Sequence, residues 1–373
     1  MSNVVEIGTC KARKGERARG FLRICDDPPI DIPISVINGR FEGKTAFISA
    51  GIHGDEINGI EVLNRFAEGI DPSTLKGVLL ILYVVNVEGY KQRRREVPFD
   101  GKDLNRCFPG DSTGSVSDRM AHTVYQEVVA RSDFGIDVHD SGLGSVLLPH
   151  PRAHIQQPDG SYDESLLADI SVFGSDIIML TPGMEGVMTF EALRRRDAFA
   201  FTVEIGGGMI LWETFISDAL TGLRNVLSDH GMIDAPIRLP QYQYVLPGRD
   251  DLAIKSPIEG IVRLRTGLGE GVNTGDLLAE ICDPITGRTE SLYAQSCGVI
   301  HDLNVHGKVQ KDEDVVGILG FQKCPDRGRR PNREQVMVLE NSPQETVKIH
   351  DSQLFEKALQ LRISGHERSP NES

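Results

Sequence analysis

Between residues 45 and about 230, short apolar runs alternate with segments whose apolar residues recur at helical spacing. This alternation constrains the fold more than any other feature of the sequence. Continuous apolar strands between amphipathic helices are typical of α/β proteins, and they predict a mostly parallel mixed sheet with helices on both faces. We expect strands at 45–50, 78–86, 134–138, 145–148, 176–180 and 199–204, and helices at 56–68, 116–131, 162–173 and 212–230.

Two segments do not follow the alternation. Residues 1–44 predict short strands and turns, including the turn signal Asn38-Gly39. Residues 87–115 are polar and basic, then rich in turn formers, without periodicity. A structureless loop of this length inside a compact domain is usually functional or disordered.

The composition changes after a proline-containing crossing at 236–247, where we place a domain boundary. We expect a catalytic domain at 1–238, a β domain at 239–322 and a polar, partly disordered tail at 323–373, with one short helix at 352–362.

The predicted β domain contains an internal repeat. The pattern Gly260-Ile-Val with Asp276-Leu-Leu recurs about 38 residues later as Gly298-Val-Ile with Asp314-Val-Val. Two such units packed together predict an all-β barrel or sandwich that resembles the biotinyl/lipoyl fold. Carriers of that fold hold a lysine at the hairpin tip, whereas the tip here is Thr286-Gly-Arg, so we do not expect a carrier.

Charge and cysteine content limit the class of protein. The net charge is −14 and the pI is about 5.2, which argues against nucleic acid or an anionic membrane as the main partner. The sequence has neither a signal region nor an apolar run long enough for a transmembrane helix. The six cysteines show no CxxC pairing, which predicts free thiols and a cytoplasmic location. Self-association into a homo-oligomer stays open.

Ionisable side chains follow three of the predicted strands. His53 and Glu56 follow the strand at 45–50, His139 directly follows the strand at 134–138, and Glu204 ends the strand at 199–204. Open α/β sheets place their sites at these strand ends. Two histidines and one glutamate form the ligand set of catalytic zinc sites, and a second carboxylate can then act as the general base.

Each of these residues also has a structural interpretation. His53 reads equally well as a packed turn histidine, and Glu56 as a carboxylate favoured by the helix dipole. Glu204 reads as a solvated strand terminus, although three glycines follow at Gly206–Gly208 and would let the backbone approach a ligand. The convergence of all the groups favours a zinc hydrolase.

Four motifs in order give a specific resemblance. They are His53-Gly-Asp-Glu56, Asp103-Leu-Asn-Arg-Cys-Phe-Pro-Gly110, Asp137-Val-His139 and Val203-Glu204-Ile-Gly-Gly. Together they resemble the succinylglutamate desuccinylase/aspartoacylase family, which belongs to the zinc carboxypeptidase group, over roughly residues 20–320. The resemblance implies a zinc carboxypeptidase-like fold in the catalytic domain.

The resemblance also implies roles for residues. One zinc ion per chain would be held by His53, Glu56 and His139, and Glu204 would deprotonate the metal-bound water and pass the proton to the leaving amine. Asn105 and Arg106 match a family pair that holds a substrate carboxylate, a task that suits the arginine fork. A further family arginine polarises the scissile carbonyl; Arg93, Arg94 and Arg95 are candidates, and Arg95 fits best.

Two further positions bear on the substrate. Arg194 stands ten residues before Glu204, where aspartoacylase has an arginine for the acidic side chain of its substrate. Asp140 replaces the threonine of the family's Asp-Leu-His-Thr, next to a predicted metal ligand, which could alter the surroundings of that ligand.

The function expected is a metal-dependent amidohydrolase that cleaves a small N-acyl amino acid by attack of metal-bound water. The alternatives are a zinc carboxypeptidase acting on a peptide end and a non-catalytic binding protein on the same fold. The β domain would narrow the cleft and disfavour long peptides, and retention of every ligand type disfavours the binding protein.

Overall fold

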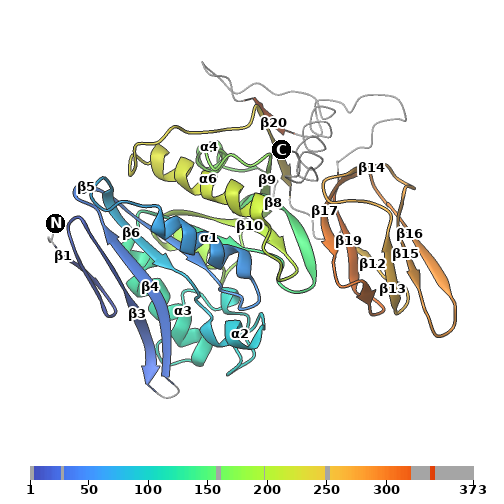
Figure 1. Cartoon of the computed structure of the whole chain (residues 1–373), viewed down its shortest axis with the longest axis horizontal. Helices are drawn as coiled ribbons and strands as arrows, with labels where there is room; N and C mark the ends of the chain where they lie inside the picture. The colour runs from blue at the N-terminus through green and yellow to red at the C-terminus, as the bar shows by residue number, and fades with distance from the viewer. Residues whose placement is uncertain are drawn as a thin grey trace, which may run out of the picture. The chain divides into compact units, whose positions relative to one another are not determined.

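The computed structural model describes residues 4–26, 29–156, 161–196, 198–247, 253–320 and 337–340 (Figure 1). The chain divides into two compact units. The first comprises Met1–Leu143, Pro151–Gly174 and Thr181–Leu239, and the second comprises Gly144–His150, Ser175–Leu180 and Pro240–Ser373.

The first unit is built on a mixed sheet with a parallel centre. Neighbouring strands in the centre run in the order β6 (Lys76–Leu82), β5 (Phe41–Ala50), β7 (Phe134–His139) and β10 (Phe199–Gly207). The antiparallel strands β4 (Pro29–Asn38) and β3 (Glu16–Asp26) continue the sheet beyond β6, and β8 (Ser145–Gln156) lies beyond β10. A hairpin of β1 (Val4–Ile7) and β2 (Cys10–Arg13) is separate. The predicted α/β class is confirmed.

Helices cover both faces of this sheet. Helix α1 (Ile57–Glu68) packs beside α6 (Glu213–Asp229) and lies on Ala50 and Val138; a Cβ at Gly59 would stand only 2.7 Å from the Val138 carbonyl oxygen, so glycine permits this close approach. Side chains alternate along β5, so Phe47 points to the opposite face. There it joins a core cluster with α3 (Val116–Glu127) and α5 (Met188–Arg196).

The segment 87–115 contains two short helices and is not the structureless loop that its composition predicts. Helix α2 (Val87–Gln92) begins where the Asn86 side chain accepts a hydrogen bond from the Gly89 N–H. The 3-10 helix η1 (Leu104–Arg106) begins where the Asp103 carboxylate accepts one from Asn105. Both are capped by side chains, and both are too short to show an apolar period. Helix α4 (Glu164–Ser171) and the 3-10 helix η2 (Val129–Arg131) complete the unit.

The second unit consists of strands, and it bears out part of the predicted β domain. The repeat corresponds to two antiparallel pairs, β13 (Gly260–Leu264) with β15 (Leu277–Cys282), and β17 (Gly298–Asn304) with β19 (Asp314–Gly320). The remaining strands are β9 (Ile177–Pro182), β11 (Tyr242–Pro247), β12 (Ala253–Lys255), β14 (Gly271–Val272), β16 (Thr289–Tyr293), β18 (Lys308–Val309) and β20 (Met337–Glu340).

The C-terminal region was predicted to be a polar tail with one short helix. Strand β20 pairs with β11, so the predicted polar tail contains at least one strand. The predicted helix at 352–362 lies outside the described residues. Within the described residues, no helix is both long enough and apolar enough to cross a membrane.

The expectation of free thiols is wrong for Cys297. Cys10, Cys25, Cys107 and Cys282 are free, whereas Cys297 is disulfide-bonded. Cys324 lies outside the described residues. The spacing of the cysteines carries no signal for this bond, because pairing depends on tertiary structure.

Candidate metal centre and active site

The turn between β5 and α1 is shaped by close packing against α2. Gly51 has a positive φ of 63°, which bends the chain directly after the strand. A Cβ at Gly54 would stand 2.0 Å from the Gly89 carbonyl carbon, so only glycine fits there. This packing places His53 in the turn and Glu56 at the residue that caps α1.

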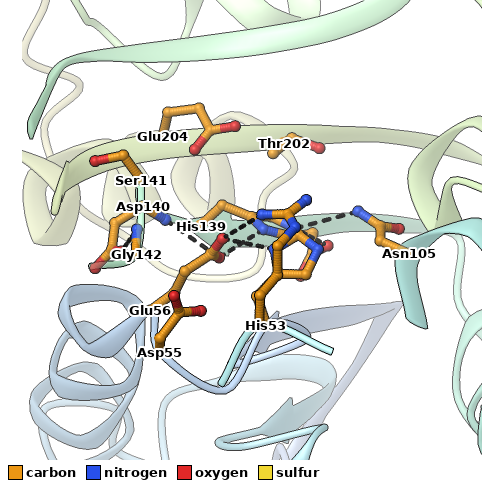
Figure 2. Close-up of polar contacts among 12 residues, drawn as sticks. His53, Asp55, Glu56, Asn105, His139, Asp140, Ser141, Gly142, Thr202 and Glu204 are labelled. Carbon is orange, nitrogen blue, oxygen red and sulfur yellow. Dashed lines mark hydrogen bonds and ion pairs between the residues drawn. The ribbon is translucent and has the colours of Figure 1, made fainter. Parts of the chain in front are cut away.

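Three buried side chains come together at this turn. The ligand atoms of His53, Glu56 and His139 all lie within 4.8 Å of one another. The Glu56 carboxylate faces the Nδ1 atoms of both histidines, with Oε1 at 2.5 Å from His53 and Oε2 at 2.8 Å from His139 (Figure 2). We call these three residues the His53–Glu56–His139 cluster. Its donor set fits a catalytic zinc site, in which three protein ligands leave one position open.

A carboxylate holds the far nitrogen of each histidine. Asp137 Oδ2 lies 2.6 Å from His139 Nε2, and Asp103 Oδ1 lies 3.1 Å from His53 Nε2. The Ser49 hydroxyl in turn donates to Asp137 Oδ1 at 2.8 Å. Carboxylates in this position orient metal-binding histidines with Nδ1 toward the ion and increase their basicity. This arrangement is the second observation that fits a metal site.

Charge in the cluster is strongly coupled. Burial opposes protonation of His139, but Asp137 and Glu56 outweigh it and raise its pKa well above the ordinary value. Burial likewise opposes protonation of His53, whose pKa is raised by Glu56 and Asp103. Burial alone would raise the pKa of Glu56, but the two histidines lower it. Without a cation, the cluster therefore holds protons that a metal ion would displace.

Asp140 follows His139 but turns its carboxylate away from the cluster. Its Oδ2 accepts hydrogen bonds from the backbone N–H and side-chain amide of Asn58, and its Oδ1 accepts one from Gly142. Burial, and then the charge of Glu56, raise the pKa of Asp140 to about 7. Its contacts join the turn after β7 to the first turn of α1.

Glu204 lies beside His139 on the neighbouring strand. The parallel register of β10 and β7 pairs Glu204 with His139 and Thr202 with Asp137, so these side chains share one face of the sheet (Figure 2). Glu204 is 9 % exposed, and its Oε1 lies 3.9 Å from the Arg152 guanidinium on β8. No hydrogen bond or ion pair among the described residues joins Glu204 to the cluster.

The catalytic-domain model of the succinylglutamate desuccinylase/aspartoacylase family matches residues 42–229. The chain belongs to the succinylglutamate desuccinylase/aspartoacylase family. That span contains all three residues of the cluster and Glu204.

Relatives with recorded activities are distant. The chain is 27% identical over 255 residues to the N-alpha-acetyl-L-2,4-diaminobutyric acid deacetylase of Halomonas elongata, covering 68% of this chain and 74% of the relative. It is 27% identical over 217 residues to the succinylglutamate desuccinylase of Yersinia pestis, covering 53% of this chain and 63% of the relative.

Solved structures similar to this chain have the same fold. A succinylglutamate desuccinylase from a Silicibacter species is 26% identical with a TM-score of 0.73, over 81% of this chain and 94% of that one. The product-bound ectoine utilization protein EutE of Ruegeria pomeroyi is 24% identical with a TM-score of 0.75, over 85% and 99%. At that identity, the second comparison supports the fold alone.

Arg95 contacts the cluster. Among the contacts of the described residues, none joins Arg93 or Arg94 to it. Its guanidinium lies 3.5 Å from Glu56 Oε1 and 3.1 Å from Asp103 Oδ2. Arg93 ends α2 in the left-handed conformation, and Arg94 pairs with Glu96 at 4.0 Å. Of the three successive arginines, Arg95 is therefore the one that contacts the cluster.

Asn105 and Arg106 lie on η1 at the edge of the site. Asn105 is buried, with Nδ2 at 3.5 Å from His139 Nε2 and Oδ1 accepting the Met188 N–H at 3.0 Å. Arg106 is exposed, and its Nη1 donates to the Asn105 carbonyl at 2.7 Å. Among the described residues, no acidic side chain forms an ion pair with Arg106.

Arg194 does not reach the site. It is exposed on α5, and its guanidinium pairs with Glu185 at 2.8 Å and Glu191 at 3.4 Å.

Several residues around the cluster were not predicted from the sequence. Asp137 precedes His139 by two residues on one strand, a spacing that could have revealed its role, whereas Arg152 on β8 gives no comparable signal.

Proposed function

We propose that this protein hydrolyses the amide bond of a small N-acyl amino acid, with one zinc ion held by His53, Glu56 and His139. One observation carries the proposal. A buried cluster of two histidines and one glutamate lies beside a separate glutamate, Glu204, that is in register with His139 on the next strand.

The enzyme class follows from the family. The chain is a hydrolase of carbon–nitrogen bonds other than peptide bonds, and the relatives with recorded activities are a deacetylase and a desuccinylase. Both act on small amino-acid derivatives, which supports an N-acyl amino acid as the substrate. A carboxypeptidase activity finds no comparable support among them.

The residues around the cluster divide the chemical work. A zinc ion in the cluster would polarise the scissile carbonyl and acidify water. Glu204 takes the proton of the attacking water and then delivers it to the amide nitrogen, because an amine anion is too poor a leaving group. Arg95 stabilises the negative charge that develops on the carbonyl oxygen. Asn105 and Arg106 bind the carboxylate of the amino acid, for which the arginine fork offers two parallel hydrogen bonds.

The base is tested by Glu204→Gln, with Glu213→Gln as the control. Glutamine keeps the size of the side chain but cannot carry the proton, so we expect kcat to fall by roughly two to four orders of magnitude while zinc content stays unchanged. Glu213 is an exposed partner of Arg65, and its substitution should leave kcat unchanged. Normal turnover by Glu204→Gln would remove it from the mechanism, and lost zinc would make it a ligand instead.

The substrate is tested by amine release from a panel of N-acetyl and N-succinyl amino acids that includes the substrates named for the two relatives. Arg106→Lys keeps the charge but loses the planar fork. We expect it to lower kcat/KM for free acids by at least about tenfold, and much less for the matching amides. Equal losses on acids and amides would contradict a carboxylate role for Arg106.

A further inference from the structure

Asn58, in the first turn of α1, bonds to two other segments of the site. It is fully buried, and its amide makes hydrogen bonds in two directions. Its Nδ2 donates to Asp140 Oδ2 at 2.8 Å, and its Oδ1 accepts the backbone N–H of Trp212 at 3.0 Å. One side chain therefore joins the segments that follow β5, β7 and β10.

The bond to Asp140 reaches the cluster. Asp140 directly follows His139, and its backbone N–H donates to Glu56 Oε2 at 3.3 Å. Its carboxylate is held by Asn58 and Gly142. The position of Asn58 thus affects two of the three residues of the cluster. It affects Glu56 through the backbone N–H of Asp140, and His139 because Asp140 is the next residue in the chain.

The bond to Trp212 reaches the turn that follows Glu204. The Trp212 indole Nε1 donates to the Gly207 carbonyl at 2.9 Å. The ring also lies against Gly206, where a Cβ would stand 2.5 Å from Trp212 Cδ1, so the contact requires glycine. Trp212 fixes this turn two to three residues after Glu204, and Asn58 fixes Trp212.

We propose that Asn58 is a positioning residue that couples the His53–Glu56–His139 cluster to the turn that follows Glu204; the catalytic part of this inference rests on the proposed function. The position demands a side chain that donates toward a carboxylate and accepts from a peptide N–H, which a primary amide does. Alanine would leave the Trp212 N–H and part of Asp140 without partners in a buried place. The turns would then shift relative to each other.

Activity is compared in the zinc-loaded full-length variants Asn58→Ala and Asn225→Ala. Asn225 is also buried, and its amide bonds with the backbone of Arg238 and Phe173, away from the cluster. Both variants should lose stability. Because a displacement of about 1 Å can cost on the order of 100-fold in rate, we expect kcat of Asn58→Ala to fall about 10- to 100-fold with KM changed less than about threefold. Asn225→Ala should keep kcat within about twofold.

Fluorescence gives a readout that does not depend on turnover, because Trp212 is the only tryptophan in the chain. In folded Asn58→Ala, we expect its emission to shift to the red and its quenching by acrylamide to increase, while Asn225→Ala emits as the wild type does. If Asn58→Ala does not fold, Asn58→Ser is measured with Asn225→Ser as its control, and the same changes of smaller size are expected.

Unchanged kcat and emission in a folded Asn58 variant would overturn the proposal, as would equal changes in the Asn225 control. The two proposals fail separately. Normal turnover by Glu204→Gln would refute the role of the base, whereas the emission of Trp212 would still show whether Asn58 holds the turn. Changed emission with normal kcat would overturn the positioning role in catalysis.

Discussion

The two histidines of the cluster are supported in different ways. His139 is held by Asp137 from the same strand, whose side chain is 1 % exposed and bonded to Ser49 in the neighbouring strand β5. His53 is held by Asp103, the residue that caps η1, whose side chain is 24 % exposed and paired with Arg95. One support is built into the sheet, and the other is supplied by the segment that connects α2 to η1.

The two carboxylates differ in what positions them: the sheet positions the support of His139, whereas connecting residues outside the sheet position the support of His53. The support of His139 follows from strand register, because Ser49 and Asp137 are paired residues of β5 and β7. The support of His53 depends on short capped helices and on an ion pair that solvent can reach. Changes in the first should therefore alter both stability and metal binding, whereas changes in the second should alter mainly the site.

The largest effect is expected when either histidine itself is removed, because its supporting carboxylate then has no ring to orient. His139→Ala and His53→Ala each remove a proposed zinc ligand, and both should lose most of the bound zinc and nearly all activity. Metal analysis of the two purified variants checks this expectation. Zinc at the wild-type level in either one would show that the histidine is not a ligand.

Acidification should weaken metal binding steeply. The carboxylates raise the pKa values of both histidines, and each must lose a proton to bind the ion. Competition should therefore begin at higher pH than for an ordinary imidazole. Below both pKa values, affinity should fall by up to about 100-fold per pH unit, because two protons are displaced. Titration with zinc at several pH values measures this slope; affinity independent of pH would contradict the proton-holding cluster.

The two carboxylates can be compared directly. Asp137→Asn should lower zinc affinity by about 10- to 100-fold, the usual result of changing such a support, and should also lower the melting temperature. Asp103→Asn should cost about tenfold or less with little change in melting temperature, because water can reach the vacated contact. A larger effect from Asp103→Asn would reverse the comparison.

Ser49→Ala gives the smallest expected effect. It removes one buried hydroxyl from Asp137 Oδ1, which should cost about 1 kcal/mol of unfolding free energy. Zinc affinity should fall by less than about tenfold, because the contact between Asp137 and His139 stays. Denaturant unfolding and zinc titration of the same variant test both parts. A loss of zinc affinity as large as that of Asp137→Asn would show that the Ser49 hydroxyl, and not the charge of the Asp137 carboxylate, determines the orientation of the His139 ring.

The sequence predicted the parts of the site that lie at strand ends. Apolar runs locate β5, β7 and β10, so the approximate positions of His53, His139 and Glu204 could be inferred before the structure was known. Their supporting residues were harder to find. Asp103 supports His53 across 50 residues of chain, and only the fold of the intervening segments brings the two together.

Short helices were the main omission in the fold. Helix α2 has six residues, which is less than two turns, and its start depends on one Asn86 side-chain bond. Helix α5 ends in three successive arginines, of which Arg194 was interpreted as a possible substrate contact. The hydrogen bonds of Asn58 gave no sequence signal, because both of its side-chain partners come from distant segments.

The parallel register of β7 and β10 has a consequence for how this protein can change during evolution. Successive side chains of a strand point to opposite faces, so deleting one residue of β10 before Glu204 would turn that carboxylate to the wrong side of the sheet. The exposed turn at Asp283–Arg288 has no such constraint. Insertions and deletions among homologues should therefore accumulate in turns of that kind, while the length of β10 is kept.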